Sequence, residues 1–294
     1  MKRTKAMLAL LLALVMCIGL MTACAKKPAA TDTDVKEPAQ PETPKAEEAD
    51  DLAYITGNGK MVIGYTVYEP MNYTDANGKF TGFDTELAKL VCEKLGVVPE
   101  FVEINWDTKE VELGAKSIDC IWNGLTITED RKASMSISDP YVKNAQVIVV
   151  KADSGISSTA DLVGKAVVAE VASAGELQIL GDEENKPEEN LAKAEYTAMS
   201  KQTDCLMEVK AGTADAAVLD WTLAKSMVGE GTDYSDLIMI DGLELATEEY
   251  GVAFRSGSNV TAKVNQIMAE LVADGTLPAL AEKYGLSLAP AIAG

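Results

Sequence analysis

Short apolar runs alternate with helical patterns along most of this chain, from about Leu52 to its last residue. Residues 61–64 are typical of a strand, and the apolar residues of 84–95 recur at helical spacing until Gly96 ends the pattern. Alternation of this kind predicts α/β lobes with largely parallel sheets. The other expected elements are strands at 101–104, 120–122, 165–169 and 216–219, a crossover strand at 146–150, and helices at 110–116 and from Ser173.

In each of two pairs of short segments, the two segments have similar sequences, which suggests two similar lobes. The pairs are 59–63 with 164–168 and 115–119 with 211–215. The second pair leads into two apolar strands, one ending at Asn123 and the other at Asp220. Ligands of open α/β sheets bind beyond the carboxyl ends of strands. We therefore expect Asn123 and Asp220 to face each other across a cleft, although similarities this short also arise by chance.

The beginning of the chain differs from the rest. Residues 1–23 are typical of a bacterial export signal, because basic residues precede the apolar stretch 7–20 and small residues precede Cys24. Cys24 stands where a lipoprotein carries its acylated cysteine; the alternative is a plain cleaved signal with an incidental cysteine. Residues 24–52 have too little apolar surface to order themselves. We expect a lipidated disordered tether there, holding the protein at a membrane face.

The chain is strongly acidic, with a formal net charge of −20. Such a charge repels nucleic acid and anionic lipid headgroups, so no polyanionic partner is expected. Histidine is absent from the sequence, which excludes a Ser-His or Cys-His nucleophile and removes the commonest metal ligand. We expect neither a metal nor a cofactor. Among Cys92, Cys120 and Cys205 at most one disulfide can form, and the apolar contexts of Cys92 and Cys120 predict buried thiols.

The most informative motif follows the apolar run 118–122 and reads NGLTITEDR from Asn123 to Arg131. Its hydroxyls recur at Thr126 and Thr128, a spacing that suits a strand end leading into a helix N-terminus with free N–H groups. With the arginine guanidinium beside them, these groups predict a clamp for a carboxylate. The alternative is an exposed arginine that pairs with the two acidic residues preceding it.

Ser173 and Asp220 would complete a site for a zwitterion. Ser173 begins a capping box with Glu176 after a predicted strand, which places a second helix N-terminus at a strand's carboxyl end. Asp220, opposite Arg131, would receive an ammonium group. An ordinary helix cap and an exposed loop aspartate are the alternatives. One carboxylate and one arginine across a cleft match a free amino acid.

Two aromatic residues, Tyr68 and Trp106, lie in expected loops beside polar residues. Aromatic side chains usually pack in the core, and that alternative stays open. In a cleft, the two rings would clasp the side-chain stem of the ligand.

The body of the chain, 57–285, resembles family three of the bacterial extracellular solute-binding proteins, the polar amino acid receptors of ABC importers. The segments that carry the resemblance are 77–84, 105–107, 117–119, 124–131, 138–141, 161–165, 250–253 and 274–276. The contacts that it implies are stacking by Tyr68 and Trp106, backbone and hydroxyl bonds from Gly124 and Thr126, α-carboxylate binding by Arg131 and Ser173, and α-amino binding by Asp220.

The resemblance also implies an architecture and a role. The expected fold is the two-lobed type II periplasmic-binding-protein fold, with two crossover strands, lobe 1 at 53–146 and 250–294, and lobe 2 at 147–249. Such a protein would be a monomer, tethered at the outer face of the bacterial cytoplasmic membrane. It would close around an amino acid by a hinge motion and deliver it to an ABC transporter permease.

Two other functions remain open at this stage. Related folds include periplasmic dehydratases acting on cyclohexadienyl amino acids, for which Glu69 or Glu110 would be the acid. The third possibility is an extracellular sensing module. The side chain of the ligand is open as well, because Glu69 and Glu110 would suit a cationic group, and Thr66 and Asn72 a polar one. The loop 171–174 lacks the glycine usual in the family.

Overall fold

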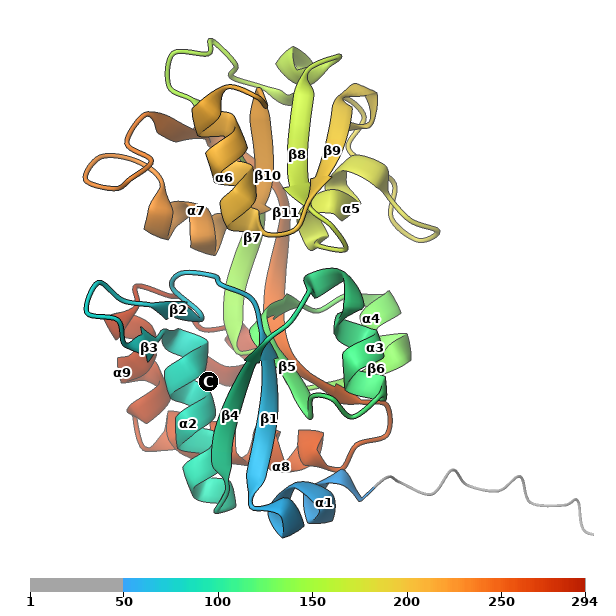
Figure 1. Ribbon diagram of the computed structural model, residues 1–294, viewed down its shortest axis with the longest axis vertical. Helices are drawn as coiled ribbons and strands as arrows, with labels where there is room; N and C mark the ends of the chain where they lie inside the picture. Colours follow the sequence, from blue (N-terminus) through green and yellow to red (C-terminus); the bar gives the residue numbers. More distant parts are fainter. Residues whose placement is uncertain (1–49, 294) are drawn as a thin grey trace, which may run out of the picture. The chain divides into compact units, whose positions relative to one another are not determined.

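Two lobes joined by two long strands make up the described part of the chain. The computed structural model describes residues 50–293, and the joining strands are β7 (Val142–Lys151) and β11 (Leu237–Arg255) (Figure 1). These strands are antiparallel neighbours, with Tyr250 opposite Val142 at one end and Leu237 opposite Lys151 at the other. The expected α/β fold with two crossover strands is confirmed, and the expected strand at 146–150 lies within β7.

The first lobe is built around a sheet in which three neighbouring strands run parallel. Its strands are β1 (Lys60–Tyr65), β4 (Val98–Glu103), β5 (Cys120–Thr126) and β6 (Met135–Ile137), with a small hairpin of β2 (Tyr73–Thr74) and β3 (Phe80–Thr81). Its helices are α1 (Asp51–Asn58), α2 (Phe83–Leu95), α3 (Lys109–Gly114), α4 (Glu129–Ser134), α8 (Val260–Ala273), α9 (Thr276–Lys283) and α10 (Pro290–Ala293), with a 3₁₀ turn at Trp106–Thr108. β1 pairs in parallel with both β4 and β5.

The second lobe is smaller and repeats the parallel pattern. Its strands are β8 (Ala166–Glu170), β9 (Glu195–Met199) and β10 (Ala216–Asp220), and its helices are α5 (Ala174–Leu180), α6 (Gln202–Ala211) and α7 (Trp221–Met227), with 3₁₀ turns at Thr159–Leu162 and Leu191–Lys193. Strand order through both lobes is β4-β1-β5-β11-β7-β10-β8-β9, and β6 pairs with β11 beside this path. The carboxyl ends of β5 and β10 therefore approach the junction of the lobes from opposite sides (Figure 1).

Helix α2 shows how local sequence sets these elements. Its first turn carries Asp84 and Glu86 and its last turn Lys94, which suits the helix dipole. Gly96 ends the helix with a φ of 73°, a conformation that glycine adopts without steric cost. The expected helix at 84–95 is confirmed to within one residue.

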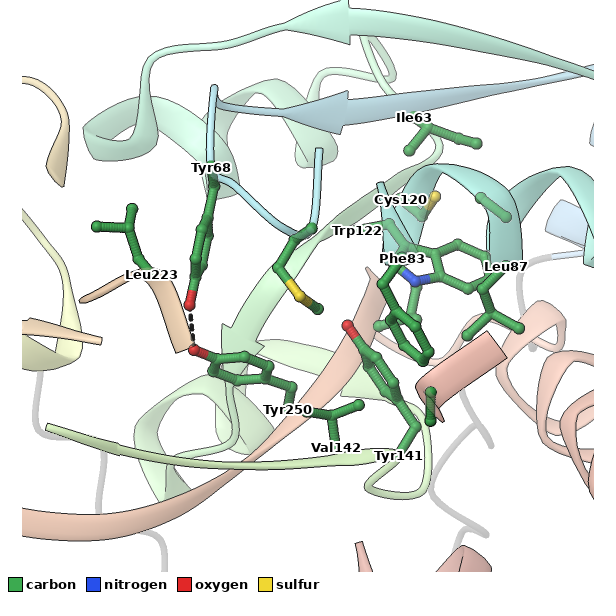
Figure 2. Close-up of a cluster of buried hydrophobic side chains, with 14 of the residues drawn as sticks. Ile63, Tyr68, Phe83, Leu87, Cys120, Trp122, Tyr141, Val142, Leu223 and Tyr250 are labelled. Carbon is green, nitrogen blue, oxygen red and sulfur yellow. Dashed lines mark hydrogen bonds between the residues drawn. The ribbon is translucent and has the colours of Figure 1, made fainter. Parts of the chain in front are cut away.

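An aromatic cluster fills the core between α2 and the crossover strands (Figure 2). The rings of Phe83 and Tyr141 stack at 6.1 Å between centroids, and Trp122 packs beside them with no exposed surface. At the edge of this cluster, the hydroxyl oxygens of Tyr68 and Tyr250 lie 2.5 Å apart and share a hydrogen bond (Figure 2). The cluster and the bond to Tyr250 thus fix the position of the Tyr68 ring.

Two expected boundaries need correction. The strand expected at 120–122 runs on to Thr126, so Asn123 and Gly124 lie inside it rather than beyond its end. The tether expected at 24–52 overlaps helix α1, which begins at Asp51. The Asp51 carboxylate is only 2% exposed and accepts a hydrogen bond of 3.0 Å from Nε of the buried Arg255. A buried ion pair that joins α1 to the end of β11 belongs to the folded body, not to a tether.

Several expectations concern single groups or the chain's first segment. Cys92, Cys120 and Cys205 are free and buried, which confirms Cys92 and Cys120 as buried thiols. Between residues 50 and 293, no helix has the length and apolar character needed to span a bilayer. Within the same residues no cluster of acidic or cysteine side chains is arranged to hold a metal ion. The predicted export signal at 1–23 and the lipidation site at Cys24 lie outside the described residues.

Asp51→Ala is expected to lower the free energy of unfolding by about 3 kcal/mol or more, because it deprives a buried guanidinium of a carboxylate partner. Lys116→Ala is the matched control. Lys116 Nζ lies 3.9 Å from the same carboxylate, but its side chain is 51% exposed, so the cost should stay below about 1 kcal/mol. Urea unfolding measures both values, and equal small losses would contradict the buried pair.

Candidate functional site

One cavity between the lobes collects the eight residues that the sequence nominated for the charged ends and the stem of the ligand. It has about 270 Å³ of space, a figure that includes open solvent. The nominated residues that line it are Tyr68, Trp106, Asn123, Gly124, Thr126, Arg131, Ser173 and Asp220. Three further residues, Glu170, Ala174 and Gln202, also line it and were not nominated. Arg131 comes from the first lobe and Asp220 from the second, so the two charges share one gap.

Arg131 forms the basic end of the cavity. Thr128 caps helix α4, its hydroxyl accepting a hydrogen bond of 3.2 Å from the Arg131 N–H, so the local pattern places the arginine on the first turn. The guanidinium is 9% exposed and donates through Nη1 to the Thr126 carbonyl at 2.6 Å. Burial lowers the pKa of Arg131, with nearby carboxylates acting in the opposite direction. Since a guanidinium stays charged at any physiological pH, this end carries a positive charge.

The carbonyl of Ala172 binds two cations from the other lobe. It accepts hydrogen bonds from Arg131 Nη2 at 3.1 Å and from Lys109 Nζ at 3.2 Å. Ala172 has a φ of 56°, the left-handed conformation that favours glycine, although the expected glycine is absent from this loop. Burial, followed by the charge of Arg131, lowers the pKa of Lys109 to about 8. Lys109 was not nominated from sequence, yet it links the two lobes beside the clamp.

Asp220 forms the acidic end and is held by amides. Its carboxylate accepts hydrogen bonds from the side-chain amides of Asn144, Gln146 and Gln202, and its N–H donates to Gln202 Oε1 at 3.0 Å. Asn144 and Gln146 lie on β7 and also donate to the carboxylate of Glu248 on β11. Burial raises the pKa of Asp220. The acidic end is thus built partly from the crossover strands themselves.

Asn123 and Gly124 support the cavity wall through contacts within the first lobe. The amide of Asn123 accepts from the N–H and hydroxyl of Thr66 and donates to the Thr66 carbonyl and to Asn72 Oδ1, so its hydrogen bonds are internal. The N–H of Gly124 donates to Asp84 at 2.7 Å, which leaves only its carbonyl for a ligand. A Cβ at Gly124 would lie 2.9 Å from the Tyr68 ring, so the ring requires glycine here.

The remaining nominated residues, Tyr68, Trp106 and Ser173, also line the cavity. Tyr68 and Trp106 are 3% and 5% exposed and line the cavity, so they are core residues that also present an edge to it. Ser173 caps helix α5, its hydroxyl accepting from the Glu176 N–H at 3.1 Å. The Glu176 carboxylate accepts from the N–H of Ala172 rather than from that of Ser173. This bond fixes the strained loop that carries the cation-binding carbonyl.

Glu170 is the unexpected member of the cavity. It is the last residue of β8, one position beyond the strand end expected from sequence, and is 3% exposed. Its Oε1 atom is buried and has no hydrogen-bond partner in the described structure. Burial raises the pKa of Glu170 to about 8, and the nearby charge of Asp220 acts in the same direction. Nothing in the apolar pattern before it distinguishes this glutamate from a solvated strand-end residue.

The side chains proposed to read the ligand's variable group lie elsewhere. Thr66 and Asn72 are buried and bonded to Asn123. Glu69 accepts a hydrogen bond of 3.1 Å from Ser226, and Glu110 lines an outer hollow next to Lys109. None of these four lines the cavity. The carboxyl group inside the cavity, besides that of Asp220, is therefore that of Glu170.

A larger open hollow lies outside this cavity, along the crossover strands. Its wall includes Trp221, Lys143 and Glu244, and it has about 1,800 Å³ of space that includes open solvent. The nominated residues are absent from its lining. It lacks the enclosed opposite charges that make the smaller cavity a candidate for a zwitterion.

Comparison with known proteins gives concordant results. The family model described as bacterial extracellular solute-binding proteins, family 3, matches residues 61–287. The arginine-binding extracellular protein ArtP of Bacillus subtilis is 30% identical, over 78% of this chain and 87% of ArtP. The L-cystine-binding protein TcyJ of Escherichia coli is also 30% identical, over 79% and 85%. A crystal structure of a mutant of ArgBP from T. maritima matches with a TM-score of 0.72 and 33% identity, covering 80% of this chain and 99% of that one.

Glu170→Gln is expected to remove part of the pH dependence of stability. The carboxyl pKa rises from 4.5 to about 8 on folding, so between these values the folded protein binds more protons than the unfolded chain. The free energy of unfolding then falls as pH rises from about 4.5 to 8, by roughly 2–4 kcal/mol between pH 5 and 8 for this group alone.

Urea unfolding without added ligand, at pH 5 and at pH 8, measures this difference. Glu195→Gln, an exposed glutamate on the neighbouring strand β9, is the matched control and should behave as the wild type. An unchanged pH dependence in Glu170→Gln would contradict a buried, unpaired carboxyl group.

Proposed function

Because the chain belongs to family 3 of the bacterial extracellular solute-binding proteins, we propose that it is an amino acid receptor of an ABC importer. The observation that carries the proposal is the pairing of Arg131 and Asp220, from different lobes, on one buried cavity. An α-amino acid has a carboxylate and an ammonium group on one carbon. Only a solute with both charges satisfies both ends of the cavity at once.

The roles follow from donor and acceptor chemistry. Arg131 Nη groups and the helix α5 cap at Ser173 would bind the α-carboxylate. The Asp220 carboxylate and the Gly124 carbonyl accept hydrogen bonds, as an ammonium group requires. Tyr68 and Trp106 would enclose the apolar stem between them. Together these groups take up both charged ends of the ligand and leave its side chain to the remaining lining.

Hinged closure is the proposed mechanism. Several contacts cross the cleft at its rim: Lys201 pairs with Glu103, Ser226 donates to Glu69, and Lys225 donates to the Gly285 carbonyl. Because these contacts are exposed or half-buried, each one stabilises the closed form only slightly. A ligand that touches both lobes binds the closed form better and shifts the population toward it. The proposed lobes, 51–146 with 250–294 and 147–249, meet within β7 and β11.

The setting of the protein is part of the proposal. We place it as a monomer at the outer face of the bacterial cytoplasmic membrane, anchored through an acylated Cys24 and a tether, and delivering the amino acid to an ABC permease. A single acyl-modified terminus holds a protein at a membrane without spanning it.

The dehydratase alternative has no support from the two acids that the sequence proposed for it. The acids considered for a dehydratase, Glu69 and Glu110, do not line the cavity. The relatives named above are binding proteins whose names specify different amino acids, arginine and cystine. A sensing module would use the same ligand contacts, and only its partner would differ.

Arg131→Ala is expected to weaken amino acid binding by at least about 30-fold, because truncating one partner of a buried charge pair costs about 2–5 kcal/mol. A thermal-shift screen of the common amino acids finds the ligand, and isothermal titration then measures its dissociation constant. Lys132→Ala is the matched control on the same helix, since Lys132 is 51% exposed and pairs only with Glu129. Wild-type affinity in Arg131→Ala would refute the clamp.

Cys24→Ser is expected to move the protein from the membrane fraction to the soluble fraction or the medium, because it removes the acylated thiol. Immunodetection after cell fractionation measures the change, and Cys92→Ser, at a buried body thiol, is the control. Retention of the Cys24→Ser protein on the membrane would contradict the lipid anchor.

A further inference from the structure

We propose that Glu170 is the residue that selects the ligand, and that the ligand is an amino acid whose side chain ends in a protonated nitrogen group. The inference rests on the proposed function and specifies the third group that the same cavity recognises. It assigns a role to a glutamate that neither the motifs nor the family resemblance singled out.

The ionisable groups that line the cavity are unequal in number before any ligand enters. Arg131 supplies one positive charge to the lining, whereas Asp220 and Glu170 supply two carboxyl groups. The α-carboxylate of an amino acid matches Arg131, and its ammonium group matches Asp220. Glu170 then remains without a counterpart, and a third, cationic group on the ligand would balance it.

Glu170 also has fewer internal partners than the other two charged residues. Arg131 donates to two carbonyls, and three side-chain amides donate to Asp220. Within residues 50–293, by contrast, no lysine or arginine nitrogen lies within 4.0 Å of the Glu170 carboxylate, and its Oε1 is buried without a partner. Burying a carboxyl group in this way costs free energy unless a donor completes it. A ligand donor would complete it.

The residues around Glu170 do not neutralise its carboxyl group, so a purely structural role does not explain why a glutamate is buried there. Gln202, on helix α6, donates to the carboxylate of Asp220 and accepts from its N–H, and a hydrogen bond from the same amide lowers the pKa of Glu170 without offsetting its burial. Lys109, on α3, is close enough to lower the pKa of Glu170, but its ammonium group donates to the Trp106 and Ala172 carbonyls. Asp220 on β10 and Asp204 on α6 raise that pKa. The surroundings thus hold the carboxyl group in place without neutralising it.

Glu170 is within reach of a ligand side chain because it lines the cavity together with the residues proposed to hold the ligand's charged ends. Glu170 precedes Ser173 by one loop, and Ser173 lies at the carboxylate end of the cavity while Asp220 lies at the ammonium end. All three line the same cavity. A third contact on the second lobe would also add to the ligand's preference for the closed form.

Isothermal titration with paired amino acids tests this inference on the purified protein. L-Arginine and L-citrulline have nearly the same shape, but only arginine is charged at the end; L-lysine and L-norleucine form a second pair. We expect the wild type to bind at least one cationic member about 10- to 100-fold more tightly than its neutral partner, the range of a charge-assisted hydrogen bond.

Glu170→Gln is expected to remove that preference by weakening the cationic member, with the affinity for its neutral partner changed less than about threefold. A residue that only held the fold together would alter both members equally. Glu195→Gln, which removes the same charge from the exposed surface of the same lobe, should keep the wild-type preference.

Proton release gives an independent readout. At pH 7 the free Glu170 carboxyl group is largely protonated, because its pKa is raised to about 8, and a cation beside it would ionise it. Titration in two buffers of different ionisation enthalpy should then show more proton release with the cationic member than with its neutral partner. The difference isolates Glu170 from Asp220, which meets the same ammonium group in both cases, and it should vanish in Glu170→Gln.

The possible failures are distinguishable. If the wild type binds a neutral or acidic amino acid best and neither cationic one, the inference about Glu170 is wrong and the receptor function stands. If Glu170→Gln keeps the preference for the cationic member, the inference is wrong in the same way. If no amino acid binds at all, the proposed function fails and this inference with it.

Discussion

Charge burial between the lobes is the constraint on which the rest of the structure depends. Arg131, Asp220 and Glu170 are all at least nine-tenths removed from water, and isolated charges in such surroundings are strongly disfavoured. Hydrogen bonds to two carbonyls stabilise the buried charge of Arg131, and hydrogen bonds from three side-chain amides stabilise that of Asp220. Both groups nevertheless line the same small cavity. A small dipolar solute, oriented along that axis, is what the arrangement stabilises best.

Side chains on the crossover strands β7 and β11 form part of the candidate site as well as the junction of the two lobes. Asn144 and Gln146 on β7 hold Asp220 and also hold Glu248 on β11, so the acidic end of the site and the junction of the lobes form one hydrogen-bonded network. At the basic end, Ala172 of the second lobe accepts from Arg131 and Lys109 of the first. Binding and closure therefore use the same groups, which explains how a small ligand can bias the position of two whole lobes.

Local sequence patterns predicted the parts of the site that local structure creates. The threonine cap before Arg131, the cap at Ser173 and the strand that ends at Asp220 each have a short-range signal, and alternating elements predicted the fold. Contacts between residues that are far apart in the sequence leave no such short-range pattern. The internal bonding of Asn123 depends on Thr66, 57 residues away. The burial of Lys109 and Glu170 could not be inferred from their polar type. Helix α1 was missed because Asp51 is ordered by Arg255, 204 residues later.

A crystal structure of the protein with its amino acid bound would test the central claim most directly. The account predicts the α-carboxylate within hydrogen-bonding distance of the Arg131 guanidinium and the α-ammonium group at the Asp220 carboxylate, with both lobes in contact with the same molecule. A ligand bound to one lobe alone, or in the reversed orientation with its ammonium group toward Arg131, would contradict it.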